Sequence, residues 1–80
     1  MTKVENKRCE KLMEEAIIKA INSKEDYKAY ERLLTDGKQV DAECKLRLAD
    51  QEIGYAEGIR QALACIGFTH ERMKELDELL

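Results

Sequence analysis

The stretch that decides the fold is 38-KQVDAECKLRLADQEIGYAEGIRQALACI-66, which holds no proline and carries two apolar stripes when wound into a helix. The first stripe advances in steps of four, three and finally seven residues, and comprises Ala42, Leu46, Ala49, Ile53, Ala56 and Leu63. The second comprises Val40, Cys44, Leu48, Tyr55, Ile59, Ala62 and Ile66. A surface helix needs one apolar stripe, so this helix, about 40 Å long, is expected to be packed on both sides.

Two shorter helices are expected before this stretch. Residues 4–21 place one apolar stripe at helical spacing: Cys9, Leu12, Met13, Ala16, Ile17, Ala20 and Ile21. Ile18 projects to nearly the opposite side. Ser23 is positioned to cap a second helix over 24–34, with Asp26 at the capping-box position three residues later.

Glycines mark two breaks in the helical pattern. Gly37 suits a left-handed C-terminal cap, and the alternative is that Asp36 caps the following helix. The sequence leaves open whether the chain breaks there or continues as helix. Gly67 is expected to end the long helix as a cap glycine. Thr69 would then cap a last helix over 70–79, with Phe68 and Met73 as its hydrophobic staple.

The chain is therefore predicted to be one all-α domain spanning residues 1–80. It has three to four helices, over 4–21, 24–34, 38–66 and 70–79, in a hairpin or bundle built around the long central helix. A chain of 80 residues is marginal alone, so we expect a homo-oligomer, with a dimer favoured. The residues expected at its interface are apolar: Ile18, Ala42, Leu46, Ala49, Ile53 and Ala56.

Charge and hydropathy exclude several classes of protein. The 14 basic and 17 acidic residues are interspersed, and no basic block is available for a phosphate backbone, so we expect no nucleic acid partner. No apolar run reaches membrane-spanning length, and the N-terminal residues lack the apolar core of a signal peptide. We therefore expect a cytoplasmic protein that does not bind a membrane.

The cysteines and the histidine do not form a recognisable catalytic or metal-binding motif. The cysteines, Cys9, Cys44 and Cys65, are far apart and form no Cys-x-x-Cys motif, so we expect free, mostly buried thiols in a reducing compartment. A bridge between chains or a redox role is the alternative. His70 with Cys65 makes neither a four-ligand zinc site nor a supported nucleophile–base pair. We expect no enzyme activity, no metal and no cofactor.

Small and aromatic residues form the candidate groove. Gly54 and Gly58 lie one turn apart, and a glycine inside a helix costs about 1 kcal/mol relative to alanine. Their presence favours close approach of another helix, with a ligand groove as the alternative. The tyrosines are expected in the core or at its rim, although such rings can also stack a ligand. The proposed groove for a ligand or partner contains Tyr27, Tyr30, Gly54, Tyr55 and Gly58.

The run 54-GYAEGIRQAL-63, closing at Ile66-Gly67, is similar to helix endings in small accessory proteins of phages and other mobile elements. It also resembles the long helix of phage anti-CBASS nucleotide sponges, which carry a glycine-centred aromatic and aliphatic run. The resemblance covers about one fifth of the chain. The Ala-Arg-Pro ending of that family is absent here, so no ligand-binding residue is carried over.

These features favour a small non-enzymatic interaction protein, an adaptor or inhibitor that binds a protein partner through its helix faces. The resemblance to phage proteins implies a counter-defence role. The alternative is a protein that binds or sequesters a nucleotide between its helices. The two hypotheses differ in one measurement, because a ligand binder gains thermal stability from its ligand and an adaptor does not.

Overall fold

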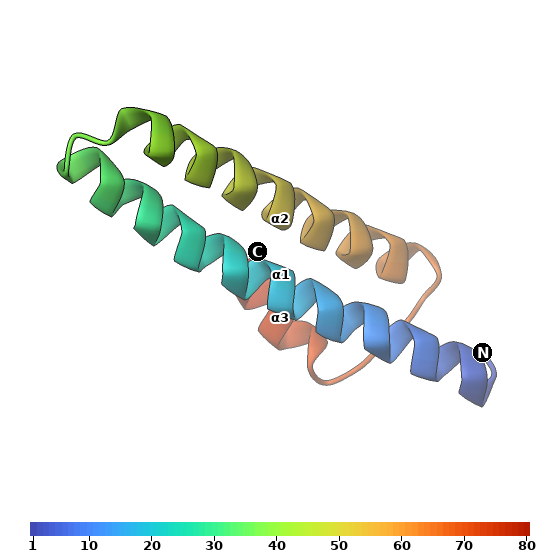
Figure 1. The fold of residues 1–80 in the computed structure, drawn as a ribbon. Coiled ribbons are helices and arrows are strands. Elements are labelled where there is room, and N and C mark those ends of the chain that lie inside the picture. Colours follow the sequence, from blue (N-terminus) through green and yellow to red (C-terminus); the bar gives the residue numbers. More distant parts are fainter.

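Two long antiparallel helices form a hairpin in the computed structural model, which describes all 80 residues. Helix α1 spans Lys3–Thr35, α2 spans Gln39–Cys65, and the short α3 spans Met73–Leu79. Figure 1 shows α1 and α2 side by side over most of their length, with α3 folded back against α1. The molecule is elongated, with extents of 52 × 17 × 16 Å. The all-α prediction is confirmed, with three helices.

The hairpin turn is built by Gly37. Its φ of 76° is the left-handed conformation that glycine adopts without steric penalty. The backbone N–H of Gly37 donates to the Leu34 carbonyl at 3.0 Å, and that of Lys38 donates to the Leu33 carbonyl at 2.9 Å, as in a Schellman cap. The chain therefore breaks here. Gly37 is the cap, because α2 begins without any side-chain capping bond.

The helices predicted over 4–21 and 24–34 are a single helix, so the predicted break between them is wrong. Ser23, expected to cap the second of them, is fully buried in the middle of α1. Its hydroxyl donates a 2.8 Å hydrogen bond to the carbonyl oxygen of Ala49 on α2. No glycine or proline lies between residues 21 and 26 to interrupt the backbone ladder, so α1 continues to Thr35.

Small residues at heptad spacing let the two long helices pack closely. The buried row of α1 advances in steps of four and three residues: Cys9, Met13, Ala16, Ala20 and Ser23. The buried row of α2 recurs every seventh residue: Ala42, Ala49, Ala56 and Leu63. Ala42, Ala49 and Ala56 were expected at an oligomer interface, and this expectation needs correction because α1 already covers all three.

The remaining residues of that predicted interface lie in different places. Leu46 and Ile53 are half-buried, and Ile53 packs against the core. Ile18 is 57% exposed on the other side of α1. The six residues therefore do not form one surface on the outside of the hairpin.

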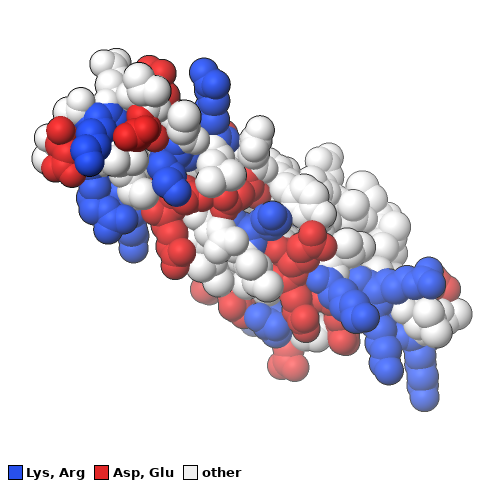
Figure 2. Space-filling model, viewed as in Figure 1, with Lys and Arg blue, Asp and Glu red and all other residues white.

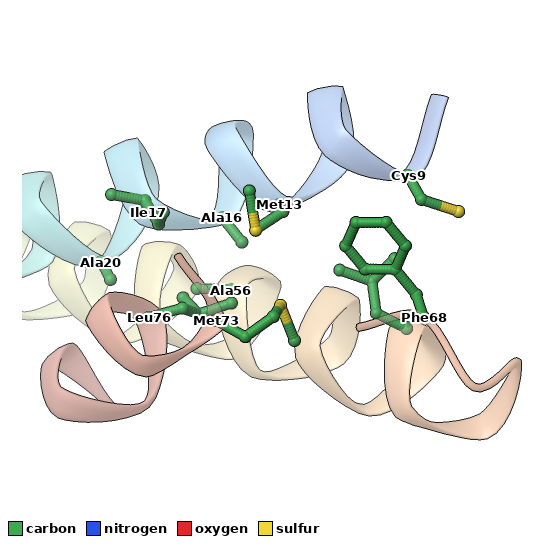
Figure 3. Close-up of a cluster of buried hydrophobic side chains, with 10 residues drawn as sticks. Cys9, Met13, Ala16, Ile17, Ala20, Ala56, Phe68, Met73 and Leu76 are labelled. Carbon is green, nitrogen blue, oxygen red and sulfur yellow. The ribbon is translucent and has the colours of Figure 1, made fainter. Parts of the chain in front are cut away.

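Helix α3 closes the end of the core near the N-terminus. Gly67, at φ 74°, forms a second Schellman cap, in which the Phe68 N–H donates to the Leu63 carbonyl at 3.0 Å. Phe68, Met73 and Leu76 then bury their side chains against α1 (Figure 3). The helix begins at Met73 instead of residue 70, so Thr69 is not its N-cap.

Candidate interaction surface

One face of α2 exposes apolar side chains along its whole length. We call it the α2 row, and its eight positions are Val40, Cys44, Leu48, Gln51, Tyr55, Gly58, Ala62 and Ile66. All eight residues of the row are exposed to solvent, and Gln51 is the only one with an amide side chain. The largest members keep 75% (Val40), 41% (Leu48), 48% (Tyr55) and 58% (Ile66) of their surface accessible. The row extends for about 40 Å along the helix.

The C-terminal half of this row lies in a part of the surface with few charges. Between Ile53 and Thr69, only Glu57 and Arg60 are charged. Figure 2 shows uncharged surface over this half of α2, whereas charged side chains crowd most of the rest of the visible face. A protein in which 39% of residues are charged therefore leaves one long apolar strip uncovered.

The row corresponds to most of the second apolar stripe predicted from the sequence. Ile59 is the exception, because it is half-buried and packs against the core. The prediction that α2 carries two apolar faces is thus confirmed. Packing on both faces is not seen within the chain, since α1 covers the first stripe and leaves the second to solvent.

Gly54 and Gly58 do not mark a close contact within the chain. A Cβ atom added at either position would meet no atom within 4 Å other than its adjacent residues and the backbone of α2 itself. The expectation of tight packing on these glycines is therefore wrong for the contacts inside one chain, because α1 packs on the opposite alanine-rich face. Gly58 instead leaves an open hole in the α2 row.

The three tyrosines do not converge on one groove. The Tyr55 hydroxyl donates a 2.9 Å hydrogen bond to Glu15, and the Lys19 ammonium lies 5.7 Å from the centre of its ring. The Tyr27 hydroxyl donates instead to Asp50. Tyr27 follows Glu15 by twelve residues on α1, which corresponds to about 18 Å. Each bonded carboxylate raises the pKa of its tyrosine above the ordinary value.

The third tyrosine, Tyr30, is half-buried between the others and the hairpin turn. The predicted groove over Tyr27, Tyr30, Tyr55, Gly54 and Gly58 is therefore not one continuous site. Of these residues, only Tyr55 and Gly58 lie on the α2 row.

A shallow groove of about 250 Å³ beside Tyr55 contains a buried acid that the sequence analysis missed. Glu52 lines it and is nine-tenths buried, and its Oε2 atom has no hydrogen-bond partner. Burial raises the pKa of Glu52, and the neighbouring carboxyl group of Asp26 raises it further. The signal was the spacing, since residue 52 lies three after Ala49 and four before Ala56, as a core position does.

The thiols and the histidine lie apart. Cys9 is buried, whereas Cys44 and Cys65 are exposed, so the prediction that the thiols are mostly buried is wrong. His70 accepts a 3.0 Å hydrogen bond at Nδ1 from the Arg72 backbone N–H. No three His, Cys, Asp or Glu side chains lie close enough together to hold a metal ion.

No protein-family model, curated protein or solved structure matches the chain. No helix combines the length and the apolar character needed to cross a membrane.

Proposed function

We propose that this chain is a small, non-enzymatic interaction protein that acts by binding a protein partner through its helix faces. The observation that carries the proposal is the exposed α2 row. Contiguous apolar surface of this kind on a charged protein marks a site of protein association, because its removal from water is favourable by about 25 cal/mol per Å².

The total surface supports the same role. A compact monomer of this mass would expose about 4,900 Å², and the chain exposes 5755 Å². The surplus of about 800 Å² is close to the area that one partner contributes to a standard protein interface. The elongated hairpin therefore exposes more surface than a compact chain of its mass, and the excess is large enough for one side of an interface.

The row fits recognition of one helix by another surface. Leu48 and Tyr55 are separated by seven residues and therefore lie on the same side of α2, as paired anchors do in helix-in-groove complexes. Tyrosine is also enriched among the residues that contribute most to binding energy. We propose that the protein serves as an adaptor or inhibitor in the cytoplasm. The resemblance of its 54–63 run to phage accessory proteins supports a counter-defence role.

The test compares two exposed apolar faces. A tagged chain with Leu48→Glu and Tyr55→Glu is compared with Ile18→Glu, whose exposed side chain lies on α1 away from the row. We expect the α2 variant to lose association with protein partners, its own copies included, while Ile18→Glu retains it. Circular dichroism checks that both variants keep the helix content of the wild type.

The nucleotide-binding alternative gives a different result. The carboxylates of Glu15 and Glu52 adjoin Tyr55 and outnumber the single ammonium of Lys19 there, so the charge beside Tyr55 does not favour a phosphate group. A rise in melting temperature with nucleotide, together with unchanged protein association in the Leu48→Glu and Tyr55→Glu chain, would overturn the proposal in favour of that alternative.

A further inference from the structure

We propose that the α2 row is occupied by a second copy of this chain, packed antiparallel about a two-fold axis that passes between Gln51 and Tyr55. The inference rests on the proposed interaction role and deepens it by naming the occupant of the row. The product is a closed dimer whose two α2 helices lie at its centre.

The spacing of the row is the same when read from either end. From Val40 to Ile66 the steps are four, four, three, four, three, four and four residues. An antiparallel copy can therefore place every row position opposite another row position. In a two-fold interface, if residue i contacts residue j of the partner, j also contacts i.

The side chains that this arrangement places opposite each other match in size. Leu48 faces Gly58, where a Cβ would meet nothing within 4 Å of this chain, so the hole is open to receive the leucine. Tyr55 faces Gln51, whose flexible side chain can adjust to the tyrosine ring. The remaining pairs are Cys44 with Ala62 and Val40 with Ile66. A parallel copy would instead put Leu48 against Leu48 and glycine against glycine, which leaves voids that close packing does not tolerate.

The charges at the two ends of the hairpin favour the same orientation. Residues 3–11 carry four basic and two acidic side chains, whereas residues 31–43, around the turn, carry two basic and four acidic ones. Figure 2 shows the basic group at the N-terminal end. An antiparallel dimer brings each basic end beside the acidic end of its partner. Such complementarity selects orientation more than it adds affinity.

The first test measures the mass of the assembly in solution and how a larger side chain at residue 58 changes it. Light scattering is expected to give twice the 9.2 kDa chain mass for the wild type. Gly58→Leu should weaken dimerisation roughly tenfold or more, because overpacking an interface is destabilising. The matched control, Glu57→Leu, adds the same side chain one position away and should dimerise as the wild type does. Adding Leu48→Ala to Gly58→Leu should restore dimerisation, because it frees the space opposite residue 58.

The second test is chemical. Ala62→Cys should form disulfide-linked dimers with Cys44 under mild oxidation, whereas Ala64→Cys, exposed but off the row, should not.

A wild-type chain that stays at 9.2 kDa at millimolar concentration overturns the inference, as does equal dimerisation of Gly58→Leu and Glu57→Leu or the absence of an Ala62→Cys cross-link. If the chain is monomeric but loses a different protein partner on Leu48→Glu, the proposed function stands and only the dimer falls. If it binds neither itself nor another protein, both fall.

Discussion

The hydroxyl of Ser23 donates a 2.8 Å hydrogen bond to the backbone carbonyl oxygen of Ala49, which joins α1 to α2 across the middle of the hairpin. Both residues are fully buried. The backbones come close here because Ala49 ends at Cβ and Ser23 carries a single heavy atom beyond it. The bond also satisfies the one buried hydroxyl of the helix interface.

Ser23→Asp distinguishes this contact from a helix cap. Aspartate serves as well as serine at an N-cap, so a capping role predicts little change in stability. In the buried contact a carboxylate would face the Ala49 carbonyl oxygen, which has no hydrogen to donate to it, and we expect the free energy of unfolding to fall by about 3 kcal/mol or more. Denaturant titration measures it. The control is Asn22→Asp, an exposed neighbour, which should change stability by only a few tenths of a kcal/mol.

The position of Ser23 shows what sequence reasoning could not reach. Capping and turn signals are local. They identified Gly67 correctly as a cap and gave Gly37 as one of two alternatives, because a positive φ favours glycine whatever lies around it. The role of Ser23 depends on Ala49, which lies 26 residues away. Local chemistry alone could not tell a capping hydroxyl from one that bonds across a helix pair.

The candidate surface was also predicted only in part. The spacing revealed both apolar stripes of α2, but it could not show which of them α1 would cover. The structure supplies the reason, because alanine at every seventh position allows α1 to approach more closely than the stripe containing Leu48 and Tyr55 would. The stripe that was expected at the oligomer interface is therefore the one that α1 covers, and the other stripe is the one exposed to solvent.

Glu52 is expected to make stability depend on pH. Its pKa is raised in the folded chain, above all by burial and then by Asp26, while Lys19 and Lys45 oppose the rise. A group of this kind stabilises the fold below its unfolded pKa and loses that contribution as the pH rises through its folded pKa. Glu52→Gln should therefore be more stable than the wild type near neutral pH, with the difference vanishing in acid.

Unfolding titrations at acidic and neutral pH measure this difference. The control is Glu57→Gln, which removes the same charge from an exposed position on α2. If both variants show the same pH dependence as the wild type, Glu52 is not the group responsible.

Leu76 should anchor α3 to the hairpin. Its side chain exposes no surface and packs in the cluster with Met13 and Ile17, whereas Leu80, at the end of the chain, is exposed. Leu76→Ala should lower the free energy of unfolding by about 2–5 kcal/mol, as deletions of buried leucine atoms do. Leu80→Ala should change it by only a few tenths of a kcal/mol. Equal effects of the two substitutions in thermal melts would show that α3 is not docked as described.

The thiols should differ in reactivity according to their burial. Cys65 is exposed and should react with a thiol reagent in the native protein, whereas Cys9 should react only as the chain unfolds. Cys44 lies on the α2 row, so its reaction should be fast in dilute solution and slower where the row is covered. Mass spectrometry of the labelled peptides over time assigns each rate. Rapid native labelling of Cys9 would contradict the packing of the N-terminal end of α1.

Gly54 and Gly37 should respond to alanine with opposite signs, although a Cβ atom added at either position would meet nothing within 4 Å. Gly54 lies inside α2, where alanine is the better helix former, so Gly54→Ala should stabilise the fold by about 1 kcal/mol. Gly37 has a φ of 76°, a conformation that costs an alanine about 1–2 kcal/mol. Space is equal at the two positions, so the backbone conformation alone sets the sign. A shift of about 4–8 °C in melting temperature per kcal/mol makes both effects measurable. A lower melting temperature for Gly54→Ala would mean that the open side of α2 is filled by another molecule at that residue, and a higher one for Gly37→Ala would contradict the left-handed cap that ends α1.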